Sequence, residues 1–130
     1  MEFIEIERQL REVLLPVFGL DEIEELKPEY SLVEQLEAES LDFVEIMWLI
    51  EECFGVVLKP SEIISGSHDQ ESLFVENRLT AAGAQLLQQQ FPHSATKIQS
   101  GLSKVDMFRM MTIRDLAARV QMKLTEGQPC

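Results

Sequence analysis

Three stretches of this chain place apolar side chains at intervals of three and four residues, which is the period of a helix with one apolar face. They lie at about residues 3–18, 40–54 and 112–124. A chain of 130 residues is long enough to bury a core without disulfides or a structural metal. The pattern therefore predicts an all-α fold in a single domain that spans residues 1–130.

The first predicted helix runs from about Phe3 to Phe18, and Pro16 interrupts it because proline removes a helix hydrogen bond. Gly19 is a suitable end for this helix. Residues 19–39 are too apolar for a free linker, so we expect them to lie across the bundle and close it. The apolar stripe of the first helix consists of Phe3, Ile6, Leu10, Val13, Leu14 and Val17.

The second predicted helix begins at Ser40, a residue type that caps helices, and ends before Gly55. It carries two apolar stripes, and we expect the wide one in the core. The narrow one is bordered by acidic side chains, which suits a docking face, although periodicity alone equally allows a place in the core. The wide stripe is Phe43, Ile46, Met47, Ile50, Cys53 and Phe54; the narrow one is Leu41, Val44 and Trp48, among Glu39, Asp42, Glu45, Glu51 and Glu52.

The second half of the chain is less regular. Within a helix predicted at residues 80–90, we expect Leu86 and Leu87 to face inward, whereas Gly83 weakens the prediction because glycine disfavours helix interiors. The other expected elements are an extended link at 55–63, an exposed loop at 64–79, a second loop at 93–103, a short helix at 104–111 that carries Val105, Phe108 and Met111, and a last helix at 112–124.

Charge is distributed unevenly along the chain, whose formal net charge is −12. Residues 1–62 hold 17 acids and 4 bases, whereas residues 63–130 hold 6 acids and 7 bases. Phosphate repulsion argues against nucleic acid as a partner of the acidic half. A basic protein surface is a more natural partner, because complementary charge speeds and orients encounters, although the same acids would also keep a small protein soluble.

Composition also limits the compartment and the role of the cysteines. No apolar run is long enough for a membrane span, and the acidic N-terminus lacks the order of a signal peptide. We therefore expect a cytoplasmic protein with no membrane insertion. Cys53 is expected in the core and Cys130 is the last residue, and their spacing suggests neither a disulfide framework nor a zinc site.

No set of residues in the sequence resembles a catalytic site. The two histidines, His68 and His93, lie in predicted loops, and nothing ties either to a serine as a base would require. Together with Asp69 and Glu71 they lack the spacing of metal ligands, so we expect neither a metal nor an enzyme. Taken alone, Ser40 is a helix cap or a modification site, since a helix N-terminus favours a phosphate group.

The neighbourhood of Ser40 resembles the core segment of acyl carrier proteins of the fatty-acid type. The family pattern is Leu-Gly-x-Asp-Ser-Leu-Asp, opening a helix that ends Glu-Glu-Phe-Gly. Two positions depart from it: Glu37 stands where the family has Gly, and Glu39 where Asp usually precedes the serine. The residues that carry the resemblance are Leu36, Ser40, Leu41, Asp42, Glu51, Glu52, Phe54 and Gly55, with weaker support from the first helix and residues 112–116.

The resemblance implies an acyl-carrier-like four-helix bundle with an extra helix in an insertion at about residues 64–111. It implies that Ser40 receives 4'-phosphopantetheine from coenzyme A through a phosphopantetheinyl transferase, and that the arm's thiol holds an acyl chain as a thioester. The wide stripe of the second helix would line the cavity that shelters this chain. Acyl-transferring or acyl-activating enzymes with basic surfaces would dock on Glu39, Leu41, Asp42, Val44, Glu45, Trp48 and Glu51.

We therefore expect a stand-alone, monomeric acyl carrier protein, specialised within fatty-acid or lipid metabolism, whose insertion serves an enlarged cavity or a private partner. Two alternatives remain. The cargo could be an aminoacyl or polyketide unit, although such carriers usually show paired glycines where this chain has Glu37 and Ala38. The chain could also be a carrier-like interaction subunit without the arm, against which the retention of Ser40, Leu41 and Asp42 argues.

Overall fold

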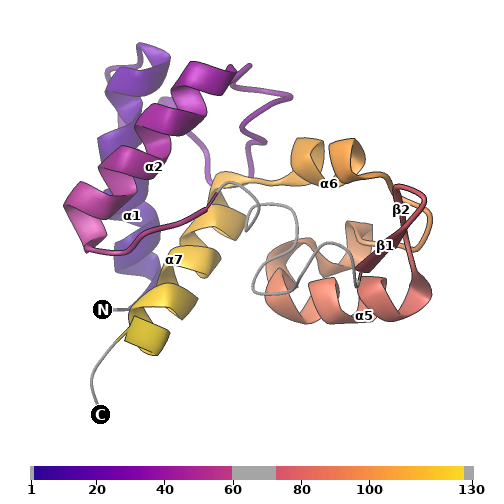
Figure 1. Ribbon diagram of the computed structural model, residues 1–130. Helices are drawn as coiled ribbons and strands as arrows, with labels where there is room; N and C mark the ends of the chain where they lie inside the picture. The colour runs from indigo at the N-terminus through magenta and orange to yellow at the C-terminus, as the bar shows by residue number, and fades with distance from the viewer. Residues whose placement is uncertain (1, 60–72, 128–130) are drawn as a thin grey trace.

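Three long helices form a bundle, and a group of shorter elements packs beside it (Figure 1). The computed structural model describes residues 2–59 and 73–127. The bundle consists of α1 (Phe3–Leu14), α2 (Ser40–Phe54) and α7 (Ile113–Gly127). The structure is mostly helical, which confirms the all-α prediction; the one exception among the described residues is a two-stranded hairpin.

Helix α1 buries the middle of the predicted stripe, whereas Phe3, Val13 and Val17 are half-buried, and the helix ends before Pro16. Ile6, Leu10 and Leu14 are completely buried. The chain then tightens into the 3-10 helix η1 (Leu15–Phe18), which has Pro16 in its first turn. Gly19 ends this turn with a φ of 67°, a left-handed conformation that glycine adopts without strain.

The segment between α1 and α2 closes the bundle, as predicted. A short 3-10 helix, η2 (Ile23–Glu25), is fixed to α1 because Arg11 donates hydrogen bonds to the carbonyl oxygens of Ile23 (3.0 Å) and Leu26 (2.7 Å). Farther on, Ser31 pairs with Thr112 in an isolated antiparallel bridge at the start of α7. The segment is therefore attached at both ends to helices of the bundle.

Helix α2 has the predicted bounds, and Gly55 ends it with a φ of 71°. Most of its wide stripe is buried, but the prediction that Cys53 lies in the core is wrong, because this side chain is exposed. Cys53 lies at the edge of the stripe, whereas Ile50 and Phe54 of the same last turn stay buried. Residues 55–59 form no regular element, in agreement with the predicted link, and the remainder of that link lies outside the described residues.

The shorter elements form a group that we call the insertion lobe, residues 73–110. Two parts of it differ from the sequence-based expectation. Residues 74–79 are a hairpin rather than a loop, turning through Glu76 and Asn77, which both have positive φ. Residues 92–97 form a 3-10 helix rather than a loop. The elements are β1 (Phe74–Val75), β2 (Arg78–Leu79), α5 (Ala81–Gln90), η3 (Pro92–Lys97) and α6 (Lys104–Met110).

Helix α5 is capped as predicted, because the Thr80 hydroxyl accepts a hydrogen bond from the Gly83 N–H at 2.9 Å. Gly83 has a packing reason: a Cβ there would lie 2.6 Å from the Leu73 carbonyl oxygen. Leu87 faces inward, but Leu86 is exposed, and in α6 the buried side chain is Met107 whereas Val105 is exposed. Leu86 and Val105 therefore lie on the outer faces of these short helices, although the apolar pattern of the sequence placed them in the core.

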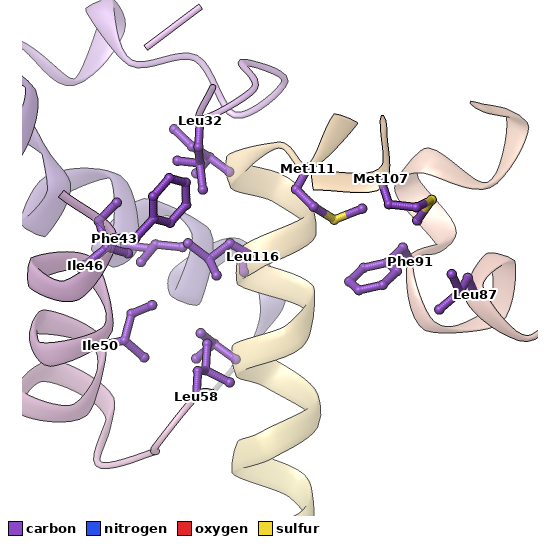
Figure 2. Packing of buried hydrophobic residues seen from close by; sticks show 14 of the residues in the cluster. Leu32, Phe43, Ile46, Ile50, Leu58, Leu87, Phe91, Met107, Met111 and Leu116 are labelled. Carbon is purple, nitrogen blue, oxygen red and sulfur yellow. The ribbon is translucent and has the colours of Figure 1, made fainter. Parts of the chain in front are cut away.

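Helix α7 lies between the other helices of the bundle and the insertion lobe (Figure 2). One side packs on α1 and α2, and another packs on η3. Leu116 points toward the α2 residues Phe43 and Ile46, whereas Met111, just before α7, points toward Phe91 of the lobe. The sequence predicted one apolar face for this helix, but residues 115–120 are all buried because the lobe covers the opposite side.

Candidate functional site

Ser40 is the first residue of α2, but it is not the residue that caps it. Glu39 occupies the cap position with extended backbone, and its N–H donates to Asp42 Oδ2 at 2.8 Å. The prediction that Ser40 is the cap is therefore wrong by one position. Asp42, three residues after the cap, accepts this hydrogen bond and so stabilises the start of the helix.

The backbone before the serine has a left-handed conformation at Glu37, a residue that stands where the family pattern has Gly. Glu37 has a φ of 54°, one of three positive values at non-glycine residues in the described part of the chain. The Ala38 N–H then donates to the Leu32 carbonyl oxygen at 2.9 Å, which holds the approach to α2 against the closing segment. Glycine, the residue of the family pattern at this position, adopts a left-handed conformation without strain.

The end of α2 provides donors for an anionic group. The N–H of Phe43 bonds to the Glu39 carbonyl oxygen at 3.1 Å, so the preceding N–H groups have no partner within the helical ladder. Such groups, together with the helix dipole, favour a phosphate at this end. The start of α2 therefore suits an anionic group.

The narrow stripe of α2 faces solvent, which excludes the position in the core that periodicity allowed. Leu41, Val44 and Trp48 are 80%, 67% and 57% exposed. We call these three residues the α2 stripe. The carboxylates around it, of Glu39, Glu45 and Glu51, are also exposed, whereas Asp42 is half-buried at the helix cap. An exposed apolar stripe inside a ring of carboxylates is complementary to an apolar patch bordered by bases.

Cys53 lies at the opposite end of α2 from Ser40. Partial burial, and then the Glu12 carboxylate, raise the pKa of its thiol above the ordinary value. A raised pKa lowers the thiolate fraction at neutral pH and with it the reactivity. This thiol is therefore not suited to nucleophilic chemistry.

Two hollows border the start of α7. The larger, of about 500 Å³, is an open groove between the closing segment and the lobe, and its lining mixes acids and bases that include Glu34, Asp106 and Arg109. The smaller is largely enclosed and mainly apolar, and none of its lining residues comes from α2. The expectation that the wide stripe of α2 lines the cavity for an acyl chain stays a prediction, since neither hollow is identified as that cavity. The smaller pocket is lined by Leu32, Leu58, Phe91, Met111, Asp115, Leu116 and Arg119.

The histidines contribute no site that the structure describes. His93 is exposed, and its ring stacks on Phe3 with centroids 4.9 Å apart. His68, Asp69 and Glu71 lie outside the described residues. Across residues 2–59 and 73–127, no three His, Cys, Asp or Glu side chains are grouped as metal ligands would be. The same residues include no helix long and apolar enough to cross a bilayer.

Comparison with known proteins places the matched region on α1, α2 and the chain around them. Residues 8–68 match the family model described as a phosphopantetheine attachment site. The chain is 40% identical over 62 residues to an acyl carrier protein of Rubrobacter xylanophilus, covering 48% of this chain and 75% of the relative. It is 41% identical over 51 residues to one from Nitratidesulfovibrio vulgaris, covering 39% and 66%. No solved structure matches significantly.

Proposed function

Because this chain belongs to the acyl carrier protein family, we propose that Ser40 is the residue that carries its 4'-phosphopantetheine arm. Proteins of this family are carriers, and the chemistry is done by the enzymes that they serve. The observation that supports Ser40 most is its place as the first residue of α2. It lies inside the matched region and comes directly before the first residue of the exposed α2 stripe.

The attachment is tested by mass spectrometry after incubation of the apo protein with coenzyme A and a promiscuous phosphopantetheinyl transferase. We expect a gain of one arm in the wild type and none in Ser40→Ala. Ser100→Ala, at an exposed serine of the lobe, is the matched control and should still gain the arm. An arm that persists in Ser40→Ala would refute the assignment, and a wild type that gains none would favour an interaction subunit.

The α2 stripe and its carboxylates are proposed as the surface on which the transferase and acyl-handling enzymes dock. The supporting observations are the exposure of Leu41, Val44 and Trp48 and the ring of Glu39, Glu45 and Glu51, with Asp42 at the cap. Partners that fit would present bases around an apolar patch. A large exposed aromatic side chain is the type of residue that dominates binding energy at such surfaces.

The docking surface is tested by the kinetics of arm transfer. We expect Trp48→Ala to lower kcat/KM at least about tenfold, equivalent to about 1.4 kcal/mol. Glu45→Lys should lower it as well, with a difference that shrinks as salt is raised. Val57→Ala, at an exposed apolar side chain outside the stripe, should leave the rate unchanged. Equal rates for Trp48→Ala and Val57→Ala would contradict this surface.

We further propose that the chain acts as a single domain and a monomer in a specialised fatty-acid or lipid pathway of the cytoplasm. The insertion lobe supports specialisation, since residues 69–130 lie beyond the region that the family model matches. Mass spectrometry of the protein from its native cell would identify the cargo. An aminoacyl or polyketide group on the arm would reject the fatty-acid assignment while leaving the carrier role intact.

A further inference from the structure

In the described part of the chain, Glu37 is the one non-glycine residue outside a hairpin turn that has a positive φ. The other two, Glu76 and Asn77, form the turn between β1 and β2, where positive values are usual. Glu37 lies in the turn that leads to α2, which is closed by the hydrogen bond from the Ala38 N–H to the Leu32 carbonyl oxygen. A residue with a Cβ is strained in this conformation, whereas glycine is not.

The side chain of Glu37 makes no polar interaction that would offset this strain. It is exposed, and within residues 2–59 and 73–127 no hydrogen bond or ion pair joins its carboxylate to another group. Backbone strain of this kind is concentrated at functional sites, where the strained residue serves a purpose other than stability. The carboxylate of Glu37 is therefore available for a contact outside the chain.

The position of Glu37 brings this contact close to the proposed attachment residue. Glu37 precedes Ser40 by three residues, so the Cα atoms of the two are at most about 11 Å apart. The α2 stripe and most of its carboxylates follow Ser40 in the chain, whereas Glu37 lies on the side that leads into the helix. An enzyme that acts at Ser40 must reach the start of α2, and it therefore comes close to Glu37.

The charge of Glu37 determines which group can face it. The carboxylate is not part of a metal site, because no three metal-ligating side chains are grouped among the described residues. Coenzyme A brings a phosphate toward Ser40, and charges repel across distances comparable to the Debye length of about 8 Å. An arginine on the enzyme would remove this repulsion, because a guanidinium binds a carboxylate through two parallel hydrogen bonds.

We propose, resting on the assignment of Ser40 above, that Glu37 determines which phosphopantetheinyl transferase loads this carrier. The transferase that fits presents an arginine to the Glu37 carboxylate, in addition to the bases that face the α2 stripe. A transferase without this arginine leaves the carboxylate unpaired beside the anionic coenzyme A and loads the chain more slowly. The preference is a difference between two affinities, and Glu37 takes no part in the chemistry.

The proposal is tested by the kinetics of arm transfer to the full-length apo protein with two enzymes, the transferase of the native cell and a promiscuous one. Glu37→Gln keeps the size of the side chain and removes its charge. We expect this variant to lower kcat/KM about fivefold with the native transferase, and less than about twofold with the promiscuous one. The loss with the native enzyme should shrink as salt is raised. Glu37→Gly should show the same difference between the two enzymes.

Glu34→Gln is the matched control, because Glu34 is an exposed carboxylate of the same segment that has no positive φ. It should keep the wild-type rate with both transferases. A native transferase that loads Glu37→Gln as fast as the wild type would overturn the proposal and leave Ser40 in place. An equal loss with both enzymes would also overturn it, since Glu37 would then act through the structure of the carrier. A wild type that gains no arm from either enzyme would overturn the Ser40 assignment itself.

Discussion

Among single residues, Asp115 joins more parts of the structure than any other polar side chain described above. Its Oδ2 accepts from the Ser94 hydroxyl at 2.6 Å, and from the N–H and hydroxyl of Thr112, both at 3.0 Å. The residue is completely buried, and its Oδ1 has no hydrogen-bond partner in the structure. Asp115 therefore links the start of α7 to η3 of the insertion lobe at the wall of the pocket.

Removal of this carboxylate should destabilise the fold strongly. We expect Asp115→Ala to lower the free energy of unfolding by about 3 kcal/mol, because the buried Ser94 and Thr112 donors lose their shared acceptor. Ser94→Ala removes one of the three hydrogen bonds and should cost roughly 1 kcal/mol. Urea unfolding measures both. Equal losses in the two variants would show that Asp115 does not join these contacts.

Glu37 carries backbone strain next to the proposed attachment site. Its φ of 54° costs a residue with a Cβ about 1–2 kcal/mol, whereas glycine adopts this conformation freely. Part of the gain from glycine is lost to its more flexible unfolded chain. We expect Glu37→Gly to raise the free energy of unfolding by roughly 0.5–1 kcal/mol. Glu34→Gly, at an exposed position with no positive φ, should not stabilise the protein in the same measurement.

Among the elements, α6 depends on a reciprocal cap at its start. The Ser103 N–H donates to Asp106 Oδ2 at 2.9 Å, and the Asp106 N–H donates to the Ser103 hydroxyl at 3.1 Å. The hydrogen bonds from the backbone and then the side chain of Ser103 lower the pKa of Asp106 below its ordinary value of 3.8. The ionised carboxylate is therefore the form that stabilises this helix.

The pH dependence follows from that direction. Since the folded pKa is the lower one, the stabilisation is fully present above the unfolded value and is lost as pH falls through the folded pKa. We expect the wild type to be more stable than Asp106→Asn at neutral pH, and the difference to vanish in strong acid. Thermal unfolding of both proteins across pH measures it. A difference that does not depend on pH would contradict the cap.

The helices and the hairpin differ in how far the sequence predicts them. α1, α2 and α7 were predictable because each has a long apolar stripe, and Pro16, Gly19 and Gly55 mark helix ends. The hairpin was missed because its turn, Glu76-Asn77, lacks the glycine that usually signals one. The α2 stripe could be located but its exposure could not, because periodicity does not say which of two stripes faces the core. The pocket was missed because its lobe side is assembled by tertiary contacts.

At the scale of the whole molecule, the bundle and the insertion lobe share one core through α7. Buried residues of the lobe and of the bundle form a continuous cluster, and Arg114 on α7 pairs with Glu7 on α1 at 3.2 Å. Parts that share a buried helix cannot separate without exposing it. This supports the proposal that residues 1–130 act as one domain.

Unfolding should therefore be a single cooperative transition. Trp48, the only tryptophan, reports on the bundle, whereas the helical signal in circular dichroism reports on both parts. We expect the fluorescence and circular dichroism curves to coincide in a urea titration. Two separated transitions, with the fluorescence change confined to one, would show that the lobe and the bundle unfold independently.

The unbroken burial of residues 115–120 limits how this protein can change over time. A helix with a solvent-exposed face tolerates substitution at about every second position. In this run, most replacements would disturb packing against either the other bundle helices or the insertion lobe. In a comparison of mutational tolerance, this run would appear as constrained as a ligand-binding motif. Its constraint would reflect enclosure by two packing partners, and not contact with a ligand.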